Sequence, residues 1–172
     1  MNDKQLKELL KRNKLLDEKI AFYLKHKTLT KQIPNEQEIK GHIEKAEHNL
    51  EFVKATMENG YFDWAIVGCY YSTYHIVLAL ILRKGYFSKN HDATLCILIK
   101  EYYKESLTEG DIELLNKIYI DNQDILFYVK SKEEREKASY STQIIFDDDY
   151  VQELIQKTLL FVRKIQNILE DN

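Results

Sequence analysis

The sequence contains little proline, glycine or cysteine and has a small net charge. It contains one proline and five glycines in 172 residues, and 44% of its residues are hydrophobic while 31% are charged. This composition is typical of a folded helical protein and excludes a disordered chain. Its two cysteines lie in apolar surroundings without a CxxC spacing, so we expect buried thiols and no zinc site. A net charge of −3 gives no general attraction to nucleic acid, although a local basic patch can still bind phosphate.

The sequence also lacks an uninterrupted apolar run as long as a membrane helix. Its most apolar stretch, from Asp63 to Gly85, is interrupted in the middle by Ser72, Thr73, His75 and tyrosines. The segment Met1 to Leu6 is charged and lacks the apolar region of a secretory signal. We therefore expect a cytoplasmic protein with no membrane partner, and we interpret the apolar stretch as a packed core helix.

Most of the chain has apolar residues at spacings of three and four, which is the period of an amphipathic helix. This period predicts helices at about residues 6–24, 36–58, 62–84, 90–103, 108–130 and 147–169. Gly60 and Gly85 mark helix ends, Asn90 marks a helix start, and Thr108 with Asp111 three residues later marks another. No segment alternates like a strand, and no internal repeat is visible.

Short connections between long amphipathic helices indicate antiparallel neighbours. We predict an all-α fold, an up-and-down antiparallel helical bundle of four to five helices at residues 35–172, preceded by an N-terminal helical extension at residues 1–34. In the central helix we expect Trp64, Ile66 and Leu78 to fill the core. Tyr70, Tyr74 and His75 are expected to be amphipathic residues of the core or of an interface, with their polar tips bonded locally.

Five blocks of residues occur in an order that resembles a HEPN domain. They are Ala46–Phe52, Tyr61–Val67, Tyr70–His75, Lys89–Thr94 and Arg135–Tyr140. The chain is similar to the compact single-domain branch of that superfamily in archaea and bacteria, over roughly residues 35–169. The resemblance implies a helical bundle, commonly dimeric, that binds RNA or nucleotides. It also implies a minimal nucleotidyltransferase partner, since such domains are often encoded beside one as a toxin–antitoxin pair.

Active HEPN ribonucleases carry an arginine followed, after four to six residues, by a histidine, and two such motifs meet across a dimer in a metal-independent site. The resemblance places Arg135 in this role, because it precedes the last predicted helix. The residue five positions later is Tyr140 and not a histidine. A phenol with a pKa of about 10 is a poor general base at neutral pH, so the sequence does not predict an efficient nuclease.

Arg83 and His91 are an alternative pair, with seven residues between them. They lie after the central helix, whereas the family's motif precedes the last helix, and Gly85 breaks the helix between them. A simpler interpretation makes His91 the first residue of a helix that Asn90 caps and Asp92 stabilises through the helix dipole.

We expect no cofactor and no metal. His42 and His48 are six residues apart and therefore lie on different faces of one helix. The acidic residues 147–149 are interpreted as a helix start, where negative charge is favourable without any cation.

Two functions of different class follow. The first is a binding module that engages RNA, a nucleotide or a nucleotidyltransferase through the region from Arg135 to Tyr140. The second is a weak or partner-dependent ribonuclease that uses Arg135 with Tyr140, or Arg83 with His91. The twelve tyrosines and the apolar central helix also predict a homodimer, because aromatic residues are enriched in the cores of interfaces.

Overall fold

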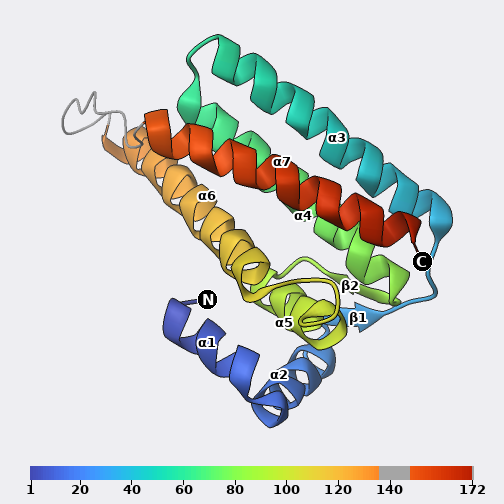
Figure 1. The fold of residues 1–172 in the computed structure, drawn as a ribbon. Coiled ribbons are helices and arrows are strands. Elements are labelled where there is room, and N and C mark those ends of the chain that lie inside the picture. The colour runs from blue at the N-terminus through green and yellow to red at the C-terminus, as the bar shows by residue number, and fades with distance from the viewer. Residues whose placement is uncertain (136–147, 172) are drawn as a thin grey trace.

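The structure is a computed structural model that describes residues 1–135 and 148–171; of residues 124–135 and 148 it describes the helical backbone alone (Figure 1). These parts of the chain form seven helices and two short strands. In chain order they are α1 (Asp3–Lys11), α2 (Asn13–Lys25), β1 (Leu29–Lys31), α3 (Glu36–Glu58), α4 (Phe62–Arg83), β2 (Tyr86–Ser88), α5 (His91–Tyr102), α6 (Glu109–Arg135) and α7 (Asp148–Glu170). The predicted helical bundle is therefore confirmed.

Helix α4 lies at the centre of the bundle, in contact with α3, α5, α6 and α7. Every residue from Ile76 to Leu82 is buried. The helix is long and apolar enough to cross a membrane, yet most of it is covered within this fold, as expected for the core helix of a bundle. Its polar interruptions are satisfied internally, since the hydroxyl of Thr73 donates to the carbonyl of Cys69 at 2.9 Å.

Helices α3 and α4 pack closely as an antiparallel pair. The hydroxyl of Ser72 in α4 donates to the backbone carbonyl of Ala46 in α3 at 2.9 Å. One turn earlier in α4, a Cβ atom on Gly68 would lie 2.6 Å from Cγ2 of Val53 and 3.1 Å from Cδ1 of Phe52. Small side chains at these positions therefore allow the two backbones to approach.

Trp64 departs from the expected packing of α4. Its side chain is 57% exposed, whereas Ile66 and Leu78 are buried as expected. Because α4 is apolar almost all round, its sequence pattern does not reveal which side neighbouring helices leave open. The prediction that Trp64 fills the core is wrong, and the residue belongs to the surface.

Two three-residue strands are a second departure, because the sequence predicts none. β1 and β2 pair antiparallel with Leu29 opposite Ser88. The hydroxyl of Ser88 donates to the carbonyl of Thr28 at 3.1 Å and fixes the end of this ribbon. Strands this short contain too few residues for a visible alternation of polar and apolar side chains.

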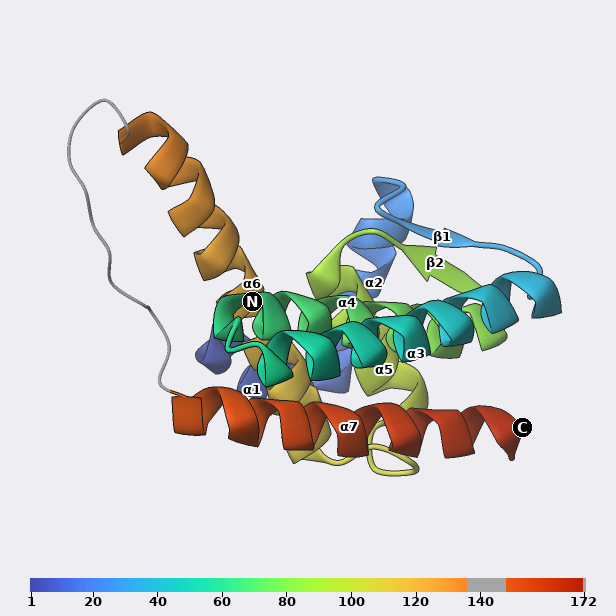
Figure 2. The ribbon, with the colours of Figure 1, turned by 90° about the horizontal axis from the view of Figure 1, so that it is seen from above.

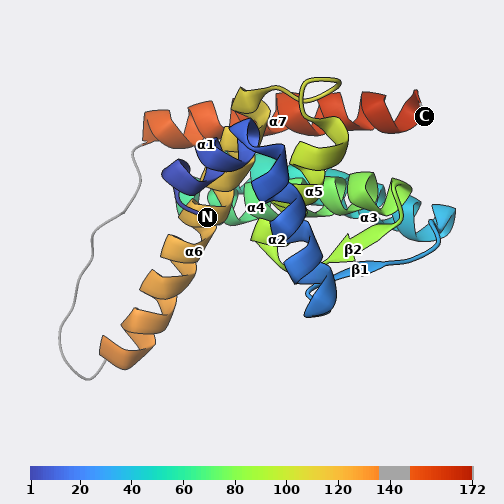
Figure 3. The ribbon, with the colours of Figure 1, turned by 90° about the horizontal axis from the view of Figure 1, so that it is seen from below.

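The N-terminal segment forms two helices where the sequence predicted one. The chain breaks at Arg12, whose backbone is not helical (φ −126°, ψ 85°). The side chains of Leu6, Leu9 and Leu16 are buried in the same core as α4 and α5. Figure 3 shows α1 and α2 on the side of the molecule where α5 lies.

Helices α6 and α7 diverge along their length. α6 begins where predicted, with the backbone amide and the hydroxyl of Thr108 both donating to Asp111 at 2.7 Å. Its C-terminal half leaves the bundle, while α7 continues beside α3 and α4 (Figures 2 and 3). α6 therefore ends at Arg135, beyond the predicted end, on a segment that projects from the molecule.

Candidate functional site

His91 lies in an aromatic cluster built by three helices. It is the first residue of α5, and the side chain of Asn90 caps the helix by accepting from the amide of Ala93 at 2.9 Å. The imidazole stacks on Tyr119 of α6, with ring centroids 4.0 Å apart, and its Nε2 lies 3.3 Å from the hydroxyl of Tyr70 in α4. The predicted helix start at His91 is thus confirmed, and the ring is also part of the interior.

Burial lowers the pKa of His91, against a smaller opposing effect of Asp92. The imidazole is therefore neutral at pH 7, the form in which it can accept a proton. Its Nδ1, the hydroxyl of Tyr119 and Oδ1 of Asn122 are buried without a hydrogen-bond partner in the described part of the chain. Two of these atoms belong to the stacked rings of His91 and Tyr119, so the aromatic cluster contains buried polar atoms that have no partner among the described residues.

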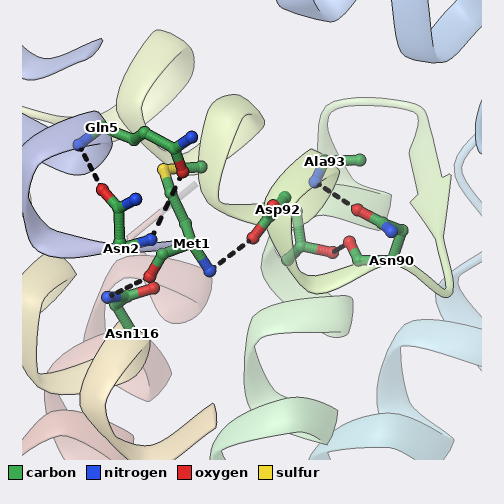
Figure 4. A network of polar contacts seen from close by, with 8 residues as sticks. Met1, Asn2, Gln5, Asn90, Asp92, Ala93 and Asn116 are labelled. Atoms are coloured by element: carbon green, nitrogen blue, oxygen red, sulfur yellow. Dashed lines mark hydrogen bonds and ion pairs between the residues drawn. The ribbon is translucent and has the colours of Figure 1, made fainter. Parts of the chain in front are cut away.

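The start of α5 is also tied to α1 and α6, as Figure 4 shows. The amino group of Met1 lies 3.0 Å from Oδ1 of Asp92, and Nδ2 of Asn116 donates to the carbonyl of Met1 at 3.1 Å. Asn2 and Gln5 form a capping box that starts α1 beside these contacts. Three helices are therefore held in register next to His91.

Arg83 lies in a different part of the molecule. Its guanidinium contacts Oε1 of Glu36 at 2.7 Å, at the far end of α4 from the aromatic cluster. Arg83 and Tyr70, which contacts His91, are thirteen residues apart in one helix, or roughly 20 Å along its axis. The structure therefore does not bring Arg83 and His91 together within one chain.

Arg135 is the last residue of α6, and its side chain is outside the described part of the structure. Tyr140 lies outside the described residues altogether. The pairing of Arg135 with Tyr140 therefore stays a prediction. The backbone places Arg135 at the tip of the projecting helix (Figure 2).

A groove of about 600 Å³ lies between α6 and α7. Three lysines line it, and each forms an ion pair with a carboxylate. These pairs are Lys117–Asp121, Lys157–Glu153 and Lys164–Asp111, at 2.6, 2.6 and 2.5 Å. Because these lysines are already neutralised, the groove does not have the unpaired positive charge of an anion site.

One pair of titratable residues was not predicted from the sequence. His42 of α3 and His75 of α4 meet with their Nδ1 atoms 2.9 Å apart. They are thirty-three residues apart, so no local motif reveals them. The antiparallel register that sets Ser72 beside Ala46 also sets His75 beside His42. The contact between the two histidines could therefore have been predicted only with knowledge of this register. Among the described residues no group of three or more metal-ligating side chains occurs.

A comparison of the sequence with profiles of known protein families shows the family of this chain. The sequence profile of the HEPN domain matches residues 39–168, which extend from the first turn of α3 to the last turn of α7 and include the segment from Arg135 to Tyr140. The chain belongs to the HEPN domain family. The resemblance seen in its blocks of residues is therefore confirmed, and residues 1–34 lie outside the matched region.

Three relatives of this HEPN chain come from archaea and bacteria. One is "Putative toxin MJ0142" of Methanocaldococcus jannaschii, 29% identical over 133 residues, which are 77% of this chain and 82% of the relative. Two are named UPF0332 protein: that of Thermotoga maritima is 26% identical over 74% of this chain and 87% of the relative, and that of Archaeoglobus fulgidus is 23% identical over 78% and 98%. The chain thus spans most of each relative.

Proposed function

We propose that this HEPN protein is an RNA- or nucleotide-binding module that acts with a minimal nucleotidyltransferase in a toxin–antitoxin-type pair. The observation that carries the proposal is the match of the HEPN profile to residues 39–168, together with the relative named "Putative toxin MJ0142". In this proposal Arg135 takes the role of the family's phosphate-binding arginine, since a guanidinium binds phosphate through charge-assisted hydrogen bonds.

Two features of the described surface support nucleic-acid binding. The C-terminal half of α6 projects from the bundle and carries Arg135, its last residue, away from the other helices (Figures 2 and 3). Phe52 on α3 and Tyr61, which precedes α4, expose 42% and 61% of their surface. Exposed aromatic rings provide stacking platforms for unpaired bases.

Binding can be tested with a fluorescein-labelled single-stranded RNA followed by anisotropy at several salt concentrations. We expect Arg135→Ala to weaken binding about tenfold, and to reduce the salt dependence by about one phosphate contact. The matched control is Arg163→Ala, which removes the same charge from an exposed position in the C-terminal half of α7. Equal binding by the wild type and Arg135→Ala would contradict the proposal.

The partner can be tested by co-expression with the nucleotidyltransferase encoded next to this chain, where the neighbouring gene is one. We expect the two proteins to purify together through size-exclusion chromatography. Absence of any nucleotidyltransferase gene beside this one, or separate elution of the two products, would remove the partner from the proposal and leave RNA binding as a separate question.

A weak, metal-independent ribonuclease is the second candidate function, favoured by the relative named "Putative toxin MJ0142". Within one chain Arg83 is bound to Glu36 and distant from His91, so Arg135 with Tyr140 is the better pair for this activity. Incubation with total RNA and tRNA, with and without EDTA, distinguishes the two functions. EDTA-resistant cleavage that is lost in Arg135→Ala would favour the enzyme, and cleavage lost in His91→Ala would move the site to the aromatic cluster.

A further inference from the structure

Two imidazoles face each other on the seam between α3 and α4. His42 and His75 come from neighbouring antiparallel helices, their rings are 5.1 Å apart between centroids, and their Nδ1 atoms are 2.9 Å apart. Both side chains are half-buried, so water reaches them. One Nδ1 donates a proton in this hydrogen bond and the other accepts it, so at least one of the two rings is neutral.

The surroundings of the pair keep both rings neutral. Burial lowers the pKa of His42, with Glu38 raising it and Lys45 lowering it further. Burial, His42 and Lys45 lower the pKa of His75 to about 4. Neutral imidazole is the form that binds a metal ion, so at pH 7 no proton has to be removed from the pair before it can act as a ligand.

The geometry points to a binding site for a late transition-metal ion, held by Nδ1 of His42 and Nδ1 of His75. A tetrahedral ion with bonds of about 2.0–2.1 Å would set the two nitrogens about 3.3 Å apart, so the pair has to widen by only a few tenths of an ångström. The ring that now donates from Nδ1 would carry its proton on Nε2 instead. Water would complete the coordination, because the described part of the chain offers no group of three ligands here.

The two nitrogen ligands select the class of metal. Imidazole suits Cu²⁺, Ni²⁺ and Zn²⁺, and affinity is expected to be highest for Cu²⁺. Mg²⁺ and Ca²⁺ prefer oxygen ligands and should not bind here. Competition from thiols is low, because Cys69 and Cys96 are both fully buried. A bound ion would join α3 to α4 and stabilise the folded state.

The test uses the purified full chain, stripped with EDTA and exchanged into chelator-free buffer at pH 7. Calorimetric titration with Cu²⁺, Ni²⁺ and Zn²⁺ should show one saturable site per chain, with a rise in melting temperature, and Mg²⁺ should give neither. His75→Gln and His42→Gln keep a polar side chain of similar size and should each weaken metal binding at least tenfold. His48→Ala is the matched control, because His48 lies on the same helix and its side chain is 83% exposed.

Nuclear magnetic resonance of the wild-type protein can show where the metal ion binds. Substoichiometric Cu²⁺ should broaden the amide signals around His42 and His75 before those around the exposed His26 and His48. Wild-type affinity in both glutamine variants, selective broadening elsewhere, or no saturable binding of the three metals would each overturn the assignment.

Discussion

Cys69 has no exposed surface and shows how tightly α4 is packed at the level of single side chains. Burial raises the pKa of its thiol to about 12, so the folded protein should not expose a reactive thiolate here. Cys69→Phe inserts a ring into a filled interior, and we expect it to lower the free energy of unfolding by about 1–3 kcal/mol. Urea denaturation followed by circular dichroism measures this cost.

The control for that substitution is Leu160→Phe, which enlarges a side chain on α7 that is 66% exposed. It should leave the midpoint of denaturation almost unchanged, since surface substitutions usually cost little. An unaltered midpoint for Cys69→Phe as well would mean that α4 is not buried at this position.

Because burial lowers the pKa of His75, the free energy of unfolding should decrease as the pH falls. The folded protein holds this pKa at about 4, whereas in the unfolded chain it returns to about 6.5. Between these values the unfolded state binds more protons, so the free energy of unfolding falls as the pH falls from about 6.5 to about 4. His75→Gln should make the free energy of unfolding less sensitive to acid. Some sensitivity should remain, because the pKa values of His42 and His91 are also lowered in the folded state.

The measurement is urea denaturation of the wild type and the variant at several pH values across that window. His48→Ala, whose side chain is exposed and lies beside Glu51, should follow the wild type. Identical pH profiles for the wild type and His75→Gln would show that the imidazole of His75 is not shielded from protonation in the folded state.

At the scale of elements, the most direct test of activity is a substitution just after the projecting half of α6. Arg135 ends this helix, and the resemblance to active HEPN ribonucleases predicts that Tyr140 stands where they carry the catalytic histidine. Tyr140→His would supply an imidazole where the phenol is a poor base. General acid–base assistance contributes about 10²–10⁴-fold, so we expect cleavage of total RNA to rise visibly on a gel, in the presence of EDTA.

Tyr103→His is the control, because it introduces the same imidazole at the end of α5, away from the tip of α6. Only the substitution at Tyr140 should increase cleavage, and Arg135→Ala should abolish the gain. If both histidine variants are as inactive as the wild type, the region after α6 lacks the convergence of two motifs that the mechanism needs.

The helices and several caps were predictable because their signals are local. The apolar period located α3 to α7, Gly85 with φ 74° follows the end of α4, and Asn90 caps α5 as expected. Trp64 and the two short strands were not predictable, since exposure on an all-apolar helix and pairing of three-residue strands depend on tertiary neighbours.

For the candidate site, too, the sequence predicted local features but not contacts between helices. The cap at His91 followed from sequence, but its stacking on Tyr119 required the crossing of α4, α5 and α6. The pair of His42 with His75 required the register of α3 on α4. The role of Arg135 came from resemblance alone, and together with Tyr140 it stays a prediction.

At the scale of the whole molecule, an apolar segment leaves the bundle. The sequence from Ile125 to Val129 is apolar throughout, and it belongs to the half of α6 that projects from the other helices (Figures 2 and 3). Trp64 and Tyr71, seven residues apart on α4, occupy one face of that helix and are both exposed. Exposed aromatic side chains that share one face of a helix are typical of interface cores.

We therefore predict a homodimer in which the projecting part of α6 and the exposed face of α4 are covered by the second copy. Light scattering at micromolar concentration should return twice the chain mass of 20.5 kDa. Trp64→Glu places a charge on the face of α4 and should shift the mass toward the monomer, because interface cores exclude unpaired charge. Leu160→Glu alters an apolar residue on α7 that is 66% exposed, compared with 57% for Trp64, and should leave the dimer intact. A wild-type mass near that of a single chain would show that the apolar part of α6 is accommodated without a second copy, and a dimer insensitive to Trp64→Glu would move the interface away from α4.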